Sequence, residues 1–416
     1  MLNKNYNAII AYIKDIIKDT IFENNVFSVG GCERDFIIGG KIKDIDLVIK
    51  SIPNGGVKFS IFLYENNYLC YEPVIYEHFG TASFRLKQYP HIELEAVQTR
   101  KECYRDMESR NPETAFGTIM DDCHRRDFTI NAIYRNISTG DVLDLNGNSF
   151  KDIENGVIRT CGDPDIIFNE DPLRILRAIR FKTRLGFTID DSTLVGMIKY
   201  VDRLSIISRE RITDEFTKMI QSKNAKEAID LIYSIGALKY VIPTSLSEKE
   251  LKDKIYYSTI DNTPSNVEIK LSRIFNNFEK DEIENILKEM RYSNDTIKEV
   301  VWYKYHSDSS KLNDLKNLRK FMYECGDLTH FIHALSIFRS EGVDSMEIYR
   351  TALKNIGNIM FGYKLPINGN DILNTLGIVG GPIVRIILND LMELAFENPD
   401  ITSDDCIKYV KEHYSK

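Results

Sequence analysis

The sequence has 416 residues, 43% of them hydrophobic and 28% charged, which is typical of a globular protein with roughly two to four domains or subdomains. Its 54 Lys and Arg against 62 Asp and Glu give a net charge of −8, so a nucleic-acid ligand would need a local basic patch. The seven cysteines form no CxxC pair, which favours reduced thiols in the cytoplasm over a zinc site or a disulfide framework. No apolar run could cross a bilayer, so we expect no membrane partner.

The predicted elements change in character along the chain. Residues 1 to about 25 predict an amphipathic helix and not a signal peptide. Short strands separated by turns follow up to about residue 160, in NVFSVGG, KDIDLVIK, ASFRLKQ, HIELEAVQT and GDVLDL. From about residue 166 helical periodicity dominates and no strand is predicted, with the clearest helices in DPLRILRAIRFKTRL, ERITDEFTKMIQS, AKEAIDLIYSIG and GGPIVRIILNDLMELAFEN. We therefore expect an α/β part followed by an all-helical part.

The first candidate site is the turn GGCERD, residues 30–35. Gly30 and Gly31 allow the backbone to approach a ligand and present N–H groups that suit phosphate oxygens. Arg34 adds a charged fork for the same oxygens. An ordinary tight turn explains the glycines about equally well, so the prediction depends on the residues that come after the turn in the chain.

Two carboxylates come next, on a predicted strand. Asp44 and Asp46 lie two residues apart, so their side chains share one face. Adjacent carboxylates repel unless a cation lies between them, and Mg²⁺ prefers carboxylates together with substrate phosphates. We therefore predict a magnesium site for phosphoryl transfer at Asp44 and Asp46. Glu93 or Glu95, with Glu95 preferred, is a third candidate carboxylate, although an exposed strand face explains both glutamates equally well.

Two arginines and a helix rich in arginine lie further along the chain. Arg125 and Arg126 precede a predicted short helix that starts near Asp127; they could reach a triphosphate or form a surface basic pair. In NEDPLRILRAIRF, residues 169–181, Pro172 and the acidic residues suit a first helical turn. The predicted core stripe contains Leu173, Ile175, Leu176 and Ile179, and the opposite side carries Asp171, Arg174, Arg177 and Arg180.

The aspartate and the first arginine of this helix could read a base. Asp171 can accept from the amino group of cytosine or adenine, and Arg174 can donate to the neighbouring ring acceptor. The ordinary alternative is an exposed, salt-bridged helix face.

The ordered motifs GGxxRD…DxD, RRDFTINA, EDPLRxLRxxRF and xRERI resemble those of the class II tRNA nucleotidyltransferases and bacterial poly(A) polymerases. The resemblance is strong over residues 26–220 and resumes at NGNDILNTLGIVGGPIVRIIL. It implies an α+β fold: a small mixed-sheet nucleotidyltransferase head over residues 1–160, followed by all-helical regions. These are a neck over 161–245 with the nucleobase-recognition helix, and a body and tail over 246–416 that bind tRNA.

The resemblance also implies roles for single residues. Asp44 and Asp46 would hold the metal, and Arg209, Glu210 and Arg211 would support the base-recognition helix. Residues 105–120 correspond to a flexible loop of the family. The complete set of expected nucleotide contacts is Gly30, Gly31, Arg34, Arg126, Asp171, Arg174, Arg177 and Arg180. One position departs from the family, which usually has a small apolar pair where this chain has Cys32 and Glu33; a glutamate beside phosphates is unfavourable unless it points away.

The expected function is the addition of CMP and AMP from CTP and ATP to the tRNA 3′ end without a template, by a cytoplasmic monomer or homodimer. The alternatives are an enzyme that adds only CC or only A, a poly(A) polymerase, and a non-catalytic RNA-binding protein. The C-terminus CIKYVKEHYSK is less basic than is usual for the polymerases, and a binding protein would not need both Asp44 and Asp46. Candidate tRNA contacts are Arg319, Lys320, Lys354 and Lys364.

Overall fold

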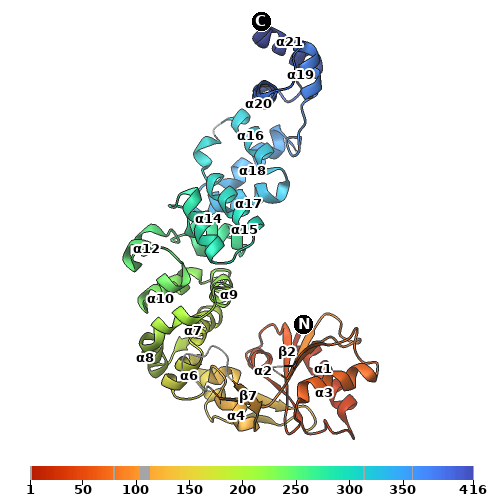
Figure 1. Ribbon diagram of the computed structural model, residues 1–416, viewed down its shortest axis with the longest axis vertical. Coiled ribbons are helices and arrows are strands. Elements are labelled where there is room, and N and C mark those ends of the chain that lie inside the picture. Colours follow the sequence, from red (N-terminus) through yellow and green to blue (C-terminus); the bar gives the residue numbers. More distant parts are fainter. Residues whose placement is uncertain (1, 78–79, 104–112, 313, 358, 416) are drawn as a thin grey trace. The chain divides into compact units, whose positions relative to one another are not determined.

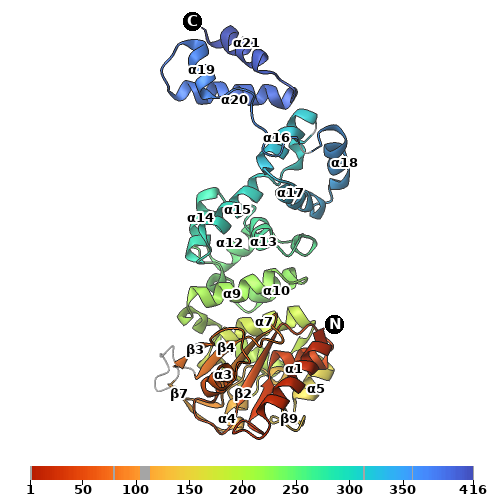
Figure 2. The same ribbon diagram turned by 90° about the vertical axis from the view of Figure 1, so that its right-hand side faces the viewer.

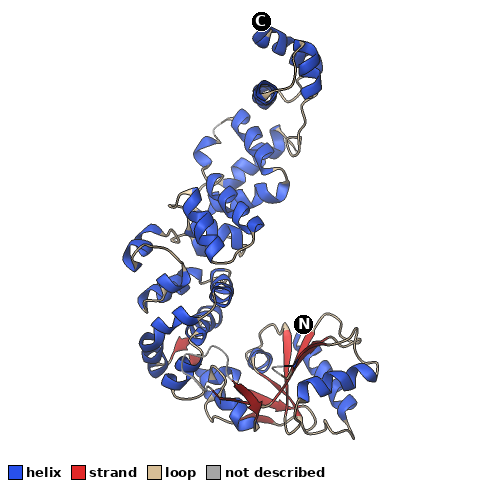
Figure 3. Cartoon of the chain, in the orientation of Figure 1, coloured by secondary structure: helices blue, strands red, loops and turns tan. Residues whose placement is uncertain are grey.

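The computed structural model describes residues 2–77, 80–103, 113–312, 314–357 and 359–415. The chain divides into two compact units, Met1–Glu248 and Lys249–Lys416. Figures 1 and 3 show that the described strands all belong to the first unit and that the second is helical. The predicted succession of a mixed sheet and helices is confirmed, whereas the boundary near residue 160 lies inside the first unit and stays a prediction.

A seven-stranded sheet organises the first unit, in the order β3-β4-β5-β2-β1-β8-β9. β2 and β5 pair in parallel and the other neighbours are antiparallel, so the sheet is mixed. This pairing sets Asp46 opposite Glu95. The strands are β1 (Val26–Val29), β2 (Asp44–Ile49), β3 (Val74–Tyr76), β4 (Thr81–Phe84), β5 (Glu93–Gln98), β8 (Ile133–Asn136) and β9 (Val142–Asp144).

The two faces of β2 have different neighbours, as the alternation of its sequence predicts. Ile45, Leu47 and Ile49 pack into a core with α1 (Leu2–Ile17) and α3 (Gly55–Glu65), which lie against the sheet in Figure 2. Val48 packs on the other face with residues of β1, β8 and α4 (Ile119–His124). Asp44 and Asp46 share the face of Val48 because successive strand residues alternate.

The remaining helices of the first unit surround or follow the sheet. α2 (Gly31–Ile37) lies between β1 and β2, and α5 (Ser149–Asn155) follows β9. The predicted helices appear as α7 (Leu173–Leu185), α9 (Arg209–Ile220) and α10 (Ala225–Ser234), with α9 and α10 beside α7 in Figure 2. The predicted core stripe of α7 is buried throughout. α6 (Pro164–Glu170), α8 (Asp191–Tyr200) and α11 (Leu238–Val241) complete the set.

Three local predictions need correction. After Arg126 the chain forms a 3₁₀ turn at Thr129–Asn131 and then β8, because the following segment pairs with β1 at a sheet position that a helix could not fill. α7 starts at Leu173, and Asp171 lies in an extended backbone between α6 and α7. The helical region also contains a two-residue strand, β11 (Thr188–Ile189), which pairs with β10 (Val157–Ile158).

The predicted flexible loop is only partly described. Residues 105–112 lie outside the described residues, whereas residues 113–120 include β7 (Glu113–Phe116), paired with β6 (Arg100–Cys103), and the start of α4.

The second unit is built from helices around its own apolar clusters. Their bounds are α12 (Glu248–Lys254), α13 (Val267–Ile274), α14 (Lys280–Glu289), α15 (Asn294–Tyr305), α16 (Leu315–Cys325), α17 (Leu328–Ser340), α18 (Ser345–Asn355), α19 (Gly369–Leu376), α20 (Pro382–Glu397) and α21 (Ser403–Tyr414). Within the described parts of both units, no helix is both long enough and apolar enough to span a membrane.

Candidate active site

A polar cavity of about 280 Å³ lies where the turn after β1, the start of β2 and the helix α7 meet. Eight of the predicted site residues line it: Gly30, Gly31, Arg34, Asp44, Asp46, Arg126, Arg177 and Arg180. Lys43 and Arg184 add two further cations to the wall, so basic groups outnumber the carboxylates there. This charge balance suits a polyanion such as a triphosphate.

The glycine turn forms one wall of this cavity. Gly30 has φ +85°, and a Cβ built on it would lie 3.1 Å from Oδ2 of Asp46, so both conformation and space require glycine here. Arg34 is almost fully buried, donates from Nε to Asp35 at 2.8 Å and from Nη1 to Oδ1 of Asn131 at 2.5 Å, and lies over the ring of Phe181. These contacts fix the guanidinium at the cavity wall.

The aspartate pair meets the chemical requirements of a divalent cation. Burial raises the pKa of Asp46 to about 6; Arg126 opposes this shift, and Asp44 and Glu95 add to it. Ionisation of Asp46 is therefore less favourable than that of an ordinary aspartate, and a cation bound nearby would favour it. Mg²⁺ needs only one or two protein carboxylates when substrate phosphates and water complete its shell. Asp44 and Asp46 fit such an ion.

Glu95 is close to this pair but does not complete a protein cluster. It is the register partner of Asp46 on β5, whereas Glu93 binds Arg85 and Ser83. Throughout the described chain, no three His, Cys, Asp or Glu side chains form a group that could hold a metal ion. Glu95 as a third catalytic carboxylate stays a prediction.

The arginines of the cavity are held by carboxylates of the protein. Arg126 pairs with Asp122 at 3.2 Å and donates to Tyr134 at 2.9 Å. Arg177 donates from Nε to Asp127 at 2.8 Å. Burial tends to raise the pKa of Asp127, but Arg177 and hydrogen bonds lower it to about 2.

The next arginines of α7 continue this pattern. Arg180 pairs with the buried Glu215 of α9 at 2.5 Å, and Arg184 lies 3.6 Å from Asp35. Sequence reasoning missed Asp122, Asp127, Glu215 and Arg184. The spacing of Arg177, Arg180 and Arg184 on one helix would have signalled the last of these.

The predicted base-recognition pair is not part of this cavity wall. Arg174 is buried and donates to the carbonyls of Ile167 at 3.0 Å and Arg125 at 2.6 Å. Asp171 pairs with Arg211 at 2.8 Å, a contact that agrees with the expected support from α9. The role of Asp171 and Arg174 in base recognition stays a prediction.

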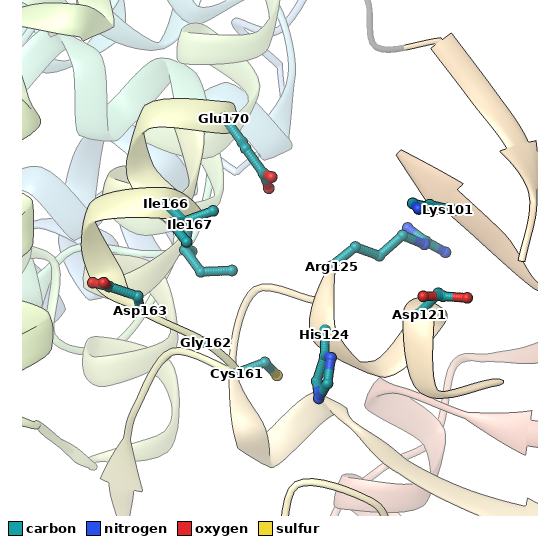
Figure 4. A pocket seen from close by; sticks show the side chains of 10 residues that line it. All are labelled: Lys101, Asp121, His124, Arg125, Cys161, Gly162, Asp163, Ile166, Ile167 and Glu170. Atoms are coloured by element: carbon teal, nitrogen blue, oxygen red, sulfur yellow. The ribbon is translucent and has the colours of Figure 1, made fainter. Parts of the chain in front are cut away.

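A second cavity, of about 400 Å³, is lined by residues of α4 and α6 and of the segments next to them (Figure 4). Its wall includes Ile167 and Glu170, both of which bond Arg174. Figure 4 shows Glu170 projecting from α6 into the space in front of Arg125 and Lys101. The cavity is lined by Lys101, Asp121, His124, Arg125, Cys161, Gly162, Asp163, Ile166, Ile167 and Glu170.

Comparisons with known proteins agree with this architecture. The model of the poly(A) polymerase head domain matches residues 26–159, and that of the probable RNA- and SrmB-binding site of polymerase A matches residues 186–247. The tRNA nucleotidyltransferase cca2 of Schizosaccharomyces pombe is 26% identical over 92% of this chain and 91% of that protein. A CCA-adding enzyme of Ligilactobacillus salivarius is 28% identical over 93% and 91%.

A solved structure shares the fold. The Bacillus stearothermophilus CCA-adding enzyme, crystallised with CTP, superposes with a TM-score of 0.74 at 20% identity, covering 93% of this chain and 92% of the other.

Proposed function

Because this chain belongs to the family of class II tRNA nucleotidyltransferases and bacterial poly(A) polymerases, we propose that it adds CMP and AMP to the 3′ end of tRNA. The substrates are CTP and ATP, pyrophosphate is released, and no nucleic acid serves as template. The observation that carries the proposal is the cavity in which Asp44 and Asp46 face Arg126, Arg177 and other cations.

Different residues of the cavity bind different parts of the nucleotide and orient it. The Gly30–Gly31 backbone, Arg34 and Arg126 bind triphosphate oxygens, and Arg177 and Arg180 do so from α7. The tRNA 3′-hydroxyl then lies in line with the α-phosphorus, and most of the rate comes from this positioning.

The family is metal-dependent, and we assign Mg²⁺ to Asp44 and Asp46, the two carboxylates that share one face of β2 at the cavity wall. When bound, Mg²⁺ activates the attacking hydroxyl and neutralises the charge of the leaving pyrophosphate.

In this proposal, Asp171 and Arg174 recognise the base of the incoming nucleotide. Cytosine and adenine both present an amino group beside an acceptor, whereas uracil and guanine do not. Arg174 must exchange one of its backbone carbonyl partners for the base. The adjoining second cavity, with Glu170 in its wall, provides the space for this change.

The second unit binds tRNA by shape and phosphate contacts, without reading sequence. Lys354 and Lys364 are exposed, whereas Lys320 is paired with Glu393 and Arg319 donates to the carbonyls of Phe396 and Glu397. We therefore favour the first two as tRNA contacts. The cytoplasm is the compartment we assign, and the protein acts as a monomer or homodimer.

The test uses transcripts that end before CCA, after C and after CC. The purified protein and Mg²⁺ receive CTP, ATP, both or neither, and product lengths are read on a sequencing gel. Addition of CCA that then stops establishes the proposal. CC only or A only would make it a partial enzyme, and a long adenylate ladder a poly(A) polymerase.

A paired variant assigns the metal site. Asp44→Asn/Asp46→Asn should abolish addition while leaving tRNA binding intact, because only the metal ligands change. Retained addition would contradict the assignment of Asp44 and Asp46. Bound tRNA with no product from the wild-type protein under any condition would favour a non-catalytic RNA-binding protein.

A further inference from the structure

Glu33 stands in the turn where the resemblance leads us to expect a small apolar residue, and the structure shows where its side chain points. It precedes Arg34 in the phosphate-binding turn, yet it is fully buried and does not line the cavity. Its Oε1 accepts hydrogen bonds from the hydroxyls of Tyr6 and Ser28. Its Oε2 accepts from Nε of Arg135 at 3.1 Å and lies 3.1 Å from Nη2 of the same arginine.

These partners come from three different elements around α2. Tyr6 belongs to α1, and Ser28 and Arg135 are register partners on β1 and β8. The Arg135 guanidinium lies over the ring of Phe36 of α2 at 5.2 Å, and the Tyr6 ring lies 5.1 Å from the same ring. Burial works to lower the pKa of Arg135, but Glu33 more than offsets this, so the pKa of Arg135 is raised. Glu33 therefore joins the turn to α1 and to the sheet through a closed set of charged and polar contacts.

The turn needs such an external restraint. Two adjacent glycines have wide conformational freedom, and Gly30 at the N-cap of α2 has no side chain that could anchor the start of the helix. The same turn must hold its backbone against Asp46 and keep Arg34 at the cavity wall. A buried carboxylate can restrain it only while it is neutralised, because an unpaired buried charge is strongly unfavourable.

We propose that Glu33 is a positioning residue for the triphosphate site, with Arg135 as its counterion and Tyr6 as its link to α1. The inference rests on the proposed function, since it assigns the control of nucleotide affinity at the same site. Substitutions can separate the two roles of this network, which are to neutralise the charge of Glu33 and to restrain the turn. Loss of Arg135 exposes the bound triphosphate to an uncompensated negative charge behind the turn, and loss of the Tyr6 hydroxyl loosens the turn without changing its charge.

The experiment compares four full-length variants for CTP binding in the presence of Mg²⁺ and for KM and kcat. Arg135→Met should raise the Kd and KM for CTP about tenfold with a smaller change in kcat, because a nearby like charge acts on the bound anion. Glu33→Gln/Arg135→Met removes that charge and should bring both constants back to within about threefold of wild type. Arg135→Lys keeps the charge and should stay close to wild type. Tyr6→Phe should raise the KM about threefold, because only part of the energy of the lost hydrogen bond is transmitted to the bound CTP.

A matched control separates positioning from stability. Ile13→Ala, in the buried face of α1, should lower the Tm but leave the KM for CTP unchanged at a temperature well below both transitions. If Arg135→Met does not fold, the KM of Tyr6→Phe for CTP alone tests whether Glu33 positions the turn. Wild-type CTP affinity in both Arg135→Met and Tyr6→Phe, or a double variant no better than Arg135→Met, would overturn the proposal. If the wild-type protein binds CTP but extends no tRNA, the proposed function fails, and the CTP affinities still decide the role of Glu33.

Discussion

Arg174 is a buried side chain whose two terminal nitrogens both donate to groups of the protein. It holds the carbonyls of Ile167 and Arg125, two parts of the chain far apart in sequence. Its planar fork can hold two such acceptors at once, which a lysine ammonium cannot do with the same geometry. In the proposed function, a base replaces one of these partners with an acceptor in nearly the same place.

Replacement of Arg174 should change which nucleotides are accepted. In Arg174→Ala the ratio of CMP to UMP incorporation should fall by about tenfold or more, since roughly 1–3 kcal/mol of discrimination is typical of one bidentate base contact. The measurement is single-nucleotide addition with each of the four triphosphates. Arg174→Lys is the control, and it should lose selectivity as well, because a lysine lacks the fork. Unchanged selectivity in both variants would remove Arg174 from base recognition.

Asp127 makes stability depend on pH in the acid range. Its pKa in the folded protein is about 2, below the unfolded value near 3.8, so its stabilisation is present above about pH 4 and is lost as the pH falls through 2. The shift corresponds to about 2 kcal/mol. The free energy of unfolding of wild type minus that of Asp127→Asn should be constant above about pH 4 and should shrink below it. Urea unfolding from pH 6 to pH 2 measures this difference, and a constant difference would refute the ion pair with Arg177.

At the scale of residues, the sequence predicted the groups that line the cavity better than the groups that hold them in place. Asp44, Asp46 and the arginines of the cavity stand in motifs with a chemical reason for their spacing. The direction of Glu33 could not be predicted, because its partners Tyr6 and Arg135 are 27 and 102 residues away. Only the pairing of β1 with β8 and the packing of α1 bring these three residues together.

Secondary-structure elements with a full period of apolar residues were predicted correctly. The stripe of α7 and the alternation of β2 are buried where periodicity placed them. The segment after Arg126 is short and its apolar residues fit either period, so a local pattern does not separate helix from strand there. The segment forms strand β8 because it pairs with β1. This pairing joins residues far apart in the sequence, so the local sequence pattern does not reveal it.

The packing of α3 on the sheet depends on one glycine. A Cβ on Gly56 would lie 2.3 Å from the carbonyl oxygen of Ala96 in β5 and 2.6 Å from that of Gly80, so backbone would have to move. Gly56→Ala should lower the free energy of unfolding by about 3 kcal/mol, the upper range for overpacking.

The measurement is urea unfolding of the full chain, with Gly140→Ala as the control. Gly140 has φ +83° but nothing within 4 Å of a built Cβ, so this variant should cost only about 1–2 kcal/mol of backbone strain. Equal losses in the two variants would show that α3 can shift away from β5.

For the whole molecule, the composition predicted the class of protein but not the division into units. With a net charge of −8, a polyanionic ligand needs a local excess of cations; the cavity wall has such an excess, whereas a basic tRNA-binding surface on the second unit stays a prediction. The boundary between Met1–Glu248 and Lys249–Lys416 is not marked by a linker in the sequence. Helix α12 begins at Glu248, so the chain stays helical across it.

The cavity lies within the first unit, so nucleotide binding should stabilise the first unit more than the second. CTP with Mg²⁺ should slow amide hydrogen exchange in the turn at residues 30–37, in β2 and in α7, because bound ligand stabilises the unit that holds it. Exchange in α16 and α20, deep in the second unit, serves as the internal control and should not change. Protection of those helices without protection of the turn would contradict the assignment of the cavity.

The ion pairs of the cavity also affect the release of pyrophosphate at the end of the proposed reaction. Arg177, Arg180 and Arg184 each have a carboxylate of the protein within reach, at Asp127, Glu215 and Asp35. An arginine that loses its phosphate partner can return to this carboxylate without being left unpaired. In the proposed function, departure of pyrophosphate therefore leaves no cation unpaired, and we expect product inhibition to be weaker than in a pocket whose arginines have no carboxylate partners.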